Sequence, residues 1–272
     1  GGGGGAGGEM FFRPWAEWLQ RRFEAELGLR EEGLAGRLAS RRGAPGAKGT
    51  PEILTTVLSG GAGGSPARRL RLVLVSNGAQ LQALNVAVYP AYELGALPIL
   101  GVDLLSFNSH QRLLFGVDWA PLLPDAAYSQ ARIAPHVAGV RDGRHAGLAS
   151  APSSKFYGEA PEFFSPHMFF ARPEGAEALR PGGQLWEVFC EYASRYAAML
   201  RRAGGEPAAA GEAALAERRQ AAFDRWHAER DPALPIFKRL FGEEWTDEYV
   251  DTVLFPGAAR EARPVTGGAA AA

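Results

Sequence analysis

Cysteine is nearly absent from this sequence. Cys190 is the single cysteine among 272 residues, so the chain has too few thiols for an internal disulfide, a four-thiolate iron–sulfur site or a cysteine-rich zinc site. The five histidines include no pair at the spacing of a metal-binding motif. We therefore expect no bound metal, and any redox reaction would need electrons from outside the chain.

An excess of one charge sign and long apolar runs are also missing. The sequence carries 29 basic and 30 acidic side chains, for a formal charge of -1, whereas proteins that bind nucleic acid usually carry a strongly basic surface. No stretch approaches the roughly 18 to 20 consecutive apolar residues that cross a bilayer. We expect neither a nucleic-acid partner nor a membrane partner.

Phosphate-binding and hydrolase motifs are absent as well. The sequence has no glycine-rich strand-to-helix loop of the dinucleotide-binding type, no P-loop and no G-x-S-x-G elbow. These absences disfavour NAD and ATP sites and leave a serine hydrolase without support. The glycines at 1–8 follow no strand, so we assign 1–10 to a disordered leader, 11–258 to a single domain and 259–272 to a disordered tail.

What the sequence does contain is a block of strand patterns between two sets of helix patterns, and its 46% hydrophobic residues can bury one large core. Alternation and turn residues predict strands at 69–75, 81–89, 99–107, 112–119 and 167–172, with Asn77-Gly78 as a two-residue hairpin turn. Apolar residues spaced by three and four predict helices at 11–27, 126–140, 184–202, 211–230 and 245–255. Residues 53–58 are a further strand candidate, and the rest of 40–66 is assigned to a linker. Short links between strands indicate an antiparallel sheet in an α+β sandwich.

Four polar residues in or beside these elements are candidates for chemistry. Asp103 interrupts an apolar strand, where burial would raise its pKa and suit a general acid, although the pattern fits a solvent-facing position equally well. Asn85, in another strand, needs a partner from the sheet, water or a ligand. Asp118 lies just before a turn, where aspartates commonly bond backbone N–H groups, and this favours a structural role. Asp231 precedes Pro232, a pattern typical of a helix N-cap followed by proline at the first helical position.

Seven segments, in order along the chain, resemble the ferredoxin-dependent bilin reductases, which reduce open-chain tetrapyrroles such as biliverdin. The segments are NVAVYP (85–90), LPILGVDLLSF (97–107), QRLLFGVDWAPL (111–122), FFSPHMFFARP (163–173), AERDPALPIF (228–237), FGEEW (241–245) and VLFP (253–256). Any one of these segments is a weak signal, whereas the ordered set is specific.

The resemblance implies a fold and a source of electrons. The fold is an α/β/α sandwich with a central antiparallel sheet flanked by helices. No cofactor is expected to be bound, and reduced ferredoxin is the external electron donor. Asp103 falls on the family's central-strand aspartate that protonates the bilin, and Asp231 falls on a second aspartate, in a loop that closes over the pigment. The resemblance therefore assigns both residues to catalysis.

Four further residues are assigned to substrate binding. By the same resemblance, Asn85, Phe107 and Ser165 contact the bilin. Arg112, near the mouth of the second predicted hairpin, is a candidate partner for one of the two bilin propionates, since guanidinium groups bind carboxylates in a bidentate manner. Alternatively, Arg112 is a solvated turn residue with no role in binding.

Two positions bear on which double bond is reduced. Family members that form phycocyanobilin have a histidine where this sequence has Asn85 and a glutamate where it has Val73, which argues against that product. The pair of Asn85 and Asp103 is similar to the phycoerythrobilin branch. Within that branch, 101–105 and 228–233 are similar to members that form 15,16-dihydrobiliverdin, whereas 237–239 and 244–249 are similar to members that act next.

The predicted function is therefore ferredoxin-dependent, two-electron reduction of biliverdin to 15,16-dihydrobiliverdin, by a radical mechanism with aspartates as proton donors. The alternatives are reduction of 15,16-dihydrobiliverdin to phycoerythrobilin, or a non-catalytic bilin carrier, against which the two aspartates count. The expected partners are the bilin, ferredoxin and the bilin reductase that acts next. The expected location is the plastid stroma of an alga, or the cytoplasm of a cyanobacterium.

Overall fold

The computed structural model describes residues 10–46, 49–60, 64–152, 162–205 and 208–260, so 1–9 of the predicted leader and 261–272 of the predicted tail lie outside the described residues. Residues 259–260, which the sequence assigns to the disordered tail, instead end a helix. Its strands are β1 (Leu29–Glu31), β2 (Ser40–Arg42), β3 (Glu52–Gly60), β4 (Ala67–Ser76), β5 (Leu81–Pro90), β6 (Ile99–Phe107), β7 (Arg112–Ala120) and β8 (Phe169–Ala171). Its α-helices are α1 (Arg13–Leu27), α2 (Gly36–Ala39), α3 (Ala126–Arg132), α4 (Ala134–Arg141), α6 (Gln184–Ala203), α7 (Glu212–Arg230), α8 (Leu234–Phe241), α9 (Glu243–Tyr249) and α10 (Pro256–Arg260). Short 3₁₀ turns lie at Tyr92–Leu94, Ala146–Leu148 and Ala176–Leu179, and a π-helical turn lies at Val250–Leu254.

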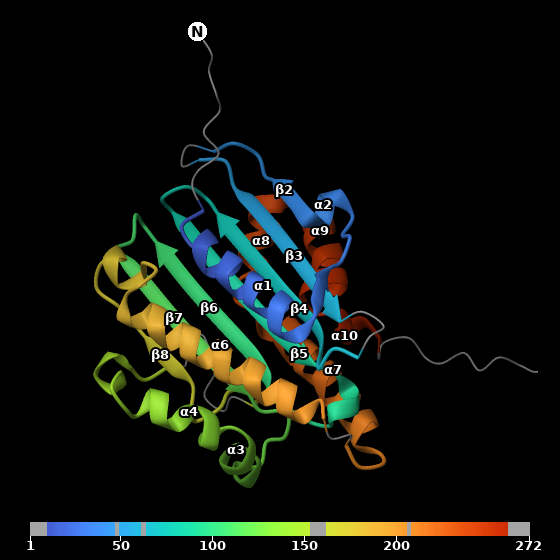
Figure 1. Ribbon diagram of the computed structural model, residues 1–272. Helices are drawn as coiled ribbons and strands as arrows, with labels where there is room; N and C mark the ends of the chain where they lie inside the picture. The colour runs from blue at the N-terminus through green and yellow to red at the C-terminus, as the bar shows by residue number, and fades with distance from the viewer. Residues whose placement is uncertain (1–9, 47–48, 61–63, 153–161, 206–207, 261–272) are drawn as a thin grey trace, which may run out of the picture.

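The strands of the described chain form one antiparallel sheet in the order β1-β3-β4-β5-β6-β7-β8, and β2 also pairs with β3. Strands β3 to β7 are neighbours both in sequence and in space, which confirms the predicted antiparallel sheet. Figure 1 shows α1 and α6 across one face, with α7 to α10 behind the other. The predicted α/β/α sandwich is therefore confirmed. No helix of the described residues is long and apolar enough to cross a membrane.

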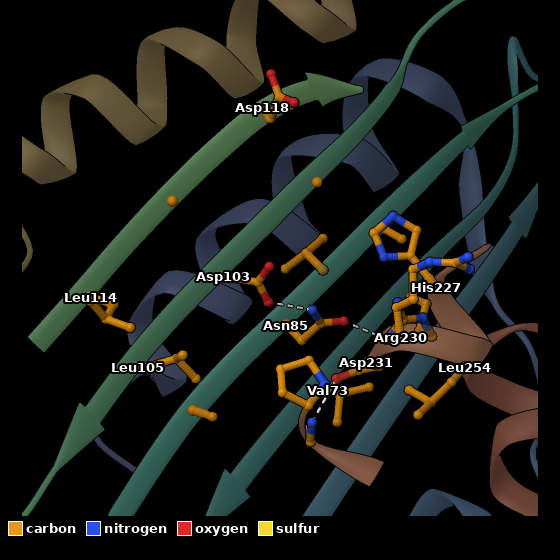
Figure 2. Close-up of a pocket in the computed structure, with 18 of the residues that line it drawn as sticks. Val73, Asn85, Asp103, Leu105, Leu114, Asp118, His227, Arg230, Asp231 and Leu254 are labelled. Carbon is orange, nitrogen blue, oxygen red and sulfur yellow. Dashed lines mark hydrogen bonds between the residues drawn. The ribbon is translucent and has the colours of Figure 1, made fainter. Parts of the chain in front are cut away.

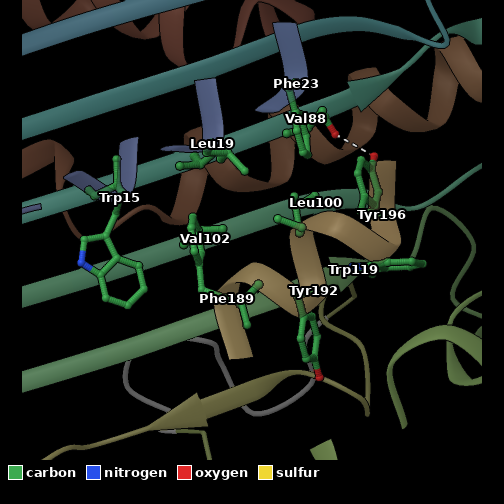
Figure 3. Close-up of a cluster of buried hydrophobic side chains, with 14 of the residues drawn as sticks. Trp15, Leu19, Phe23, Val88, Leu100, Val102, Trp119, Phe189, Tyr192 and Tyr196 are labelled. Atoms are coloured by element: carbon green, nitrogen blue, oxygen red, sulfur yellow. Dashed lines mark hydrogen bonds between the residues drawn. The ribbon is translucent and has the colours of Figure 1, made fainter. Parts of the chain in front are cut away.

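The face of the sheet toward α1 and α6 carries the main hydrophobic core, part of which is shown in Figure 3. Val88 of β5 and Leu100 of β6 are fully buried there, in the same cluster as Trp15 of α1 and Phe189 of α6. The hydroxyl of Tyr196 donates to the backbone carbonyl of Val88 at 3.0 Å. That bond matters because a buried hydroxyl without a partner is costly. Alternate residues of each central strand thus fix the sheet to these two helices.

The opposite face is filled over only part of its width. A second buried cluster lies on this face. It contains Val73 and Val75 of β4, together with Phe237 of α8 and with Trp245 and Tyr249 of α9. This cluster covers the side of the sheet near β3 and β4. Over part of β4 and over β5, β6 and β7, the same face borders an open cavity. The incomplete cover creates the site described below.

The structure corrects three boundaries near the N-terminal half. Residues 77–80 connect β4 to β5, so the predicted two-residue turn is wrong, and the N–H of Asn77 bonds the carbonyl of Leu81. The predicted linker is also wrong, because 40–42 form β2 and the strand candidate at 53–58 extends to 52–60 as β3. Strand β3 is held by pairing with β4 and β2 by pairing with β3, and local composition does not reveal this pairing. Met10, assigned to the leader, is 3% exposed and belongs to the core.

Two helical predictions also change, and one helix was not predicted. The predicted helix at 126–140 is two helices, α3 and α4, which meet at Ile133. Pro135 lies in the first turn of α4, and proline cannot continue a helix that arrives from its N-terminal side. The predicted helix at 245–255 is α9 followed by the π-helical turn. Helix α8, just before it, has no predicted range of its own.

Candidate functional site

A cavity of about 380 Å³ lies between the sheet and the segment that runs from α7 into α8. Its floor is made by alternate residues of β4, β5, β6 and β7, because alternate side chains of a strand point to the same face. Its other walls come from α7, from residues 231–233, from α8 and from Phe164 and Met168 ahead of β8. Pockets for organic ligands commonly measure roughly 300 to 1,000 Å³. The cavity is mainly apolar and has room for such a ligand.

Two predicted site residues meet on the floor of this cavity. Asn85 of β5 lies directly opposite Asp103 of β6 in the strand register. The Asn85 amide donates from Nδ2 to Oδ1 of Asp103 at 2.5 Å, as Figure 2 shows. Burial raises the pKa of Asp103, and the hydrogen bond from Asn85 and the charge of Arg71 oppose that rise. Asp103 therefore faces the cavity and not bulk solvent, which decides between the two positions that its sequence pattern allowed.

Asp231 reaches the same cavity from the opposite wall. It follows the last residue of α7, and its Oδ1 accepts a hydrogen bond from the N–H of Ala233 at 2.8 Å. Helix α8 begins at Leu234 with Pro235 in its first turn, so the predicted N-cap with Pro232 at the first helical position is wrong. Burial raises the pKa of Asp231 to about 6, and the like charge of Asp103 acts in the same direction.

The cavity also holds a third carboxyl group, that of Asp118. Its Oδ2 accepts a hydrogen bond from the N–H of Ser165 at 2.8 Å, and its Oδ1 accepts one from the Ser165 hydroxyl at 2.5 Å. Asp118 thus bonds a backbone N–H, as the sequence suggests, but the N–H belongs to a distant residue and not to the turn after β7. Burial raises the pKa of Asp118 to about 7. Ser165 is buried behind Asp118 and is not itself in the cavity wall, so any effect of Ser165 on a ligand passes through this carboxyl.

The other two predicted binding residues lie at one end of the floor. Phe107, at the end of β6, lines the cavity. Arg112 pairs with Phe107 in the register, and its guanidinium lies over the Phe107 ring at 5.7 Å from the ring centre. The Arg112 side chain is exposed and does not line the cavity. A role for Arg112 would therefore involve a ligand group that extends past Phe107 toward solvent.

Two further residues line the cavity that sequence reasoning missed. Arg71 of β4 is 3% exposed and donates to Oδ1 of Asn85 at 2.6 Å. His227 of α7 packs against Phe223, with 4.3 Å between the ring centres. Burial and the charge of Arg71 lower the pKa of His227 to about 3, so this imidazole is neutral near pH 7. The alternation of 69–75 already placed Arg71 on the same face as Val73, but the pairing with Asn85 needed the strand register.

These groups can hold and move protons around an apolar ligand. Within the described part of the chain, no cluster of three or more His, Cys, Asp or Glu side chains could hold a metal ion. Cys190 is partly buried in α6, and burial raises its pKa to about 12, so it is a thiol and not a thiolate near pH 7.

Comparison with known proteins identifies the family. Residues 16–256 match the ferredoxin-dependent bilin reductases. The chain belongs to this family. It is accordingly an oxidoreductase that reduces bilins with electrons from ferredoxin, and the predicted family, enzyme class and electron donor are confirmed.

Two named relatives define the nearby branches of the bilin reductases. A 15,16-dihydrobiliverdin:ferredoxin oxidoreductase of Gloeobacter violaceus is 31% identical over 250 residues, which cover 91% of this chain and 96% of the relative. A phycoerythrobilin:ferredoxin oxidoreductase of the same organism is 32% identical over 189 residues, which cover 69% of this chain and 74% of the relative. Both are related to this bilin reductase at a similar level of identity.

A solved structure supports the fold of this bilin reductase independently. Tomato phytochromobilin synthase, crystallised in complex with biliverdin, superposes with a TM-score of 0.74 at 18% identity. The superposition covers 93% of this chain and 85% of the tomato chain. The central antiparallel sheet with helices on both faces is therefore a shared fold.

Proposed function

We propose that this bilin reductase converts biliverdin to 15,16-dihydrobiliverdin, a step toward phycoerythrobilin. The observation that carries the proposal is the placement of Asp103 and Asp231 on opposite walls of one cavity, each with its pKa raised by burial. A carboxyl group that keeps its proton near neutral pH is suited to donate that proton to a substrate.

The reaction balances with two electrons and two protons. Each reduced ferredoxin supplies one electron, so two ferredoxins are oxidised for each bilin and the bilin passes through a radical state. Asp103 delivers a proton from the sheet and Asp231 delivers one from the segment after α7, and the 15,16 double bond becomes a single bond. The position of the donors selects the bond, because proton transfer requires close approach.

The substrate is held mainly by apolar contact. Asn85 contacts the bilin beside Asp103, Phe107 borders it at one end of the floor, and Ser165 acts by holding Asp118 in the wall. Arg112 binds a propionate at the exposed end. Val73 lies opposite Asn85 in the register and presents an apolar side chain to the cavity, so that position offers no acid for a further reduction.

The test is an anaerobic assay with purified protein, biliverdin, ferredoxin and a system that reduces ferredoxin. We expect loss of the long-wavelength biliverdin band and growth of a band to its blue, because the product has a shorter conjugated system. NADPH without ferredoxin should give no turnover. Unchanged biliverdin together with binding of the pigment would contradict the proposal and leave either a bilin carrier or an enzyme that acts on the dihydro product.

The second candidate is the following step, reduction of 15,16-dihydrobiliverdin to phycoerythrobilin. It is favoured by the relative of that name and by residues 237–239 and 244–249 of this sequence. The same assay distinguishes the two steps when 15,16-dihydrobiliverdin is supplied as substrate. If only that pigment is consumed, the second candidate is correct.

We further propose that the product passes to the bilin reductase that acts next. This transfer takes place in the plastid stroma of an alga or the cytoplasm of a cyanobacterium. Cell fractionation with compartment markers checks the location. Co-purification of the two reductases in the presence of biliverdin checks the transfer. The proposal fails if 15,16-dihydrobiliverdin is always released into solution before the second reductase binds it.

A further inference from the structure

Arg71 is a buried cation without a carboxylate partner. Its side chain lies on β4 at 3% exposure, and it lines the cavity. Its Nε atom has no hydrogen-bond partner, and the described residues place no carboxylate within ion-pair distance of its guanidinium. A buried charge is costly unless it is paired and hydrogen-bonded. The ring of Phe255, whose centre lies 5.8 Å from the guanidinium carbon, and the bond to Asn85 offset only part of this cost, which points to a role of Arg71 in the site.

The polar contact of Arg71 fixes the orientation of its neighbour. A guanidinium has donors and no acceptor, so the amide oxygen of Asn85 must face Arg71. The Arg71 bond to this oxygen measures 2.6 Å. The amide nitrogen of Asn85 then has to face Asp103, to whose Oδ1 it donates at 2.5 Å. Hydrogen bonds thus run in one direction, from Arg71 through Asn85 to Asp103, and Figure 2 shows the bond between Asn85 and Asp103.

This direction decides which oxygen of Asp103 can carry a proton. Oδ1 accepts the amide hydrogen, and a second hydrogen on the same atom would compete with it. Oδ2 has no hydrogen-bond partner among the described residues, and Figure 2 shows it turned away from Asn85. A proton held by Asp103 therefore lies on the oxygen that is open to the cavity.

We propose that Arg71 is a positioning residue for bilin reduction. It locks the Asn85 amide so that Asp103 presents its proton on Oδ2 to the substrate, and its charge stabilises the carboxylate that remains after proton transfer. This inference rests on the proposed role of Asp103 as a proton donor. Arg71, Asn85 and Asp103, on three neighbouring strands, would then act together in proton transfer.

Other charged and titratable groups around the cavity do not replace Arg71. Arg230 lines the cavity, but its guanidinium is exposed and bonds Glu229 at 2.6 Å. His227 is neutral near pH 7, and Asp231 and Asp118 are acids. Of the two arginines that the structure places in the cavity wall, only Arg71 is buried.

The first experiment compares Arg71→Gln with Arg71→Lys, which keeps the charge. Arg69→Gln is the matched control, because Arg69 lies two residues away on the same face of β4, bonds the carbonyl of Val253 and does not line the cavity. The measurement is the pH profile of single-turnover bilin reduction. In Arg71→Gln we expect at least tenfold slower reduction, and an alkaline limb that moves up by about one pH unit or more, because removal of a nearby positive charge raises the pKa of a carboxyl. Arg71→Lys and Arg69→Gln should keep the wild-type limb.

The second experiment does not depend on turnover. In pigment-free protein, the infrared band of the protonated Asp103 carboxyl is identified by its loss in Asp103→Asn. This band should persist to higher pH in Arg71→Gln and also in Asn85→Leu, which breaks the same hydrogen-bond chain and serves if Arg71→Gln does not fold. If the wild-type protein fails to reduce bilins, the proposed function fails while this titration still tests the positioning role.

Two results would overturn the inference. One is a wild-type titration of the Asp103 band in both Arg71→Gln and Asn85→Leu. The other is an equal shift in Arg69→Gln, which would mean that any positive charge on this part of β4 has the same effect.

Discussion

Replacement of Asp231 by asparagine separates a structural role of this residue from a catalytic one. The carboxyl accepts a hydrogen bond from the N–H of Ala233 at 2.8 Å, and the oxygen of an asparagine side chain can accept the same bond. Asp231→Asn therefore keeps the local turn while it removes the acid. Asp231→Ala removes both, and loss of such a backbone contact costs typically about 1 kcal/mol.

The sign of the stability change follows from the pKa of Asp231. Burial raises this pKa from 3.8 to about 6, so the folded protein binds the proton more tightly than the unfolded chain. The contribution of Asp231 to wild-type stability is therefore fully present below pH 4 and is lost as the pH rises through 6. At about 1.4 kcal/mol per pKa unit, and allowing for contact of the carboxyl with water in the cavity, the loss above pH 7 is about 2 kcal/mol.

Asp231→Asn should consequently be more stable than the wild type at pH 8 and equal to it near pH 4. For a chain of this size, 2 kcal/mol corresponds to a rise in Tm of about 4 to 8 °C. Thermal unfolding of the pigment-free proteins at pH 8, 6 and 4.5 measures the difference, which should shrink steadily across the series. Asp231→Ala should lie below Asp231→Asn at every pH.

Asp231→Asn should also reduce biliverdin at least about 100-fold more slowly than the wild type, the usual effect of losing a general acid. Because electrons still arrive from ferredoxin, a bilin radical should accumulate and give a signal in electron spin resonance. Two outcomes would refute this reasoning. One is a variant that is less stable than the wild type at pH 8, and the other is a variant that reduces biliverdin at the wild-type rate.

Three further predictions concern the floor of the cavity and its exposed end. Asp103→Asn should bind biliverdin with nearly wild-type affinity and reduce it at least about 100-fold more slowly, and wild-type turnover in the anaerobic assay would return Asp103 to a structural role. Gly101→Leu should weaken pigment binding at least tenfold and leave the Tm unchanged. A Cβ at Gly101 has no atom within 4 Å, so the leucine side chain would occupy the cavity without a clash. Unaltered affinity in a pigment titration would disprove this. Arg112→Gln should weaken binding by about two- to fivefold, as for an exposed ion pair, and no change would remove Arg112 from the binding site.

The central strands could be predicted from the sequence because their signal is local. Strict alternation and short turns mark β4 to β7, and these strands carry Asn85 and Asp103. In contrast, β2 and β3 pair at the edge of the sheet, and their flanking glycines and prolines resemble a linker. The stability of such strands comes from a partner strand and not from their own composition.

The candidate site could be predicted only in part for a related reason. Asp103 and Asp231 were found by resemblance to a family, since no local pattern brings a strand and a distant loop together. Arg71 is an example of what alternation can predict. The alternating pattern gives the face of the strand on which Arg71 lies, but not the residue that lies opposite it in the next strand. The pairing of Asn85 with Asp103, and the bond from Arg71, needed the register of three strands.

The difference between the two faces of the sheet has a consequence for how such enzymes diversify. On one face the strand residues pack tightly against α1 and α6, while on the other face alternate residues of the same strands border open space. A mutation at a cavity-facing position can therefore alter the pigment produced without disturbing the packed core. Directed evolution confined to these alternate positions should yield new product specificities at a much higher rate of folded variants than random mutagenesis of the same strands.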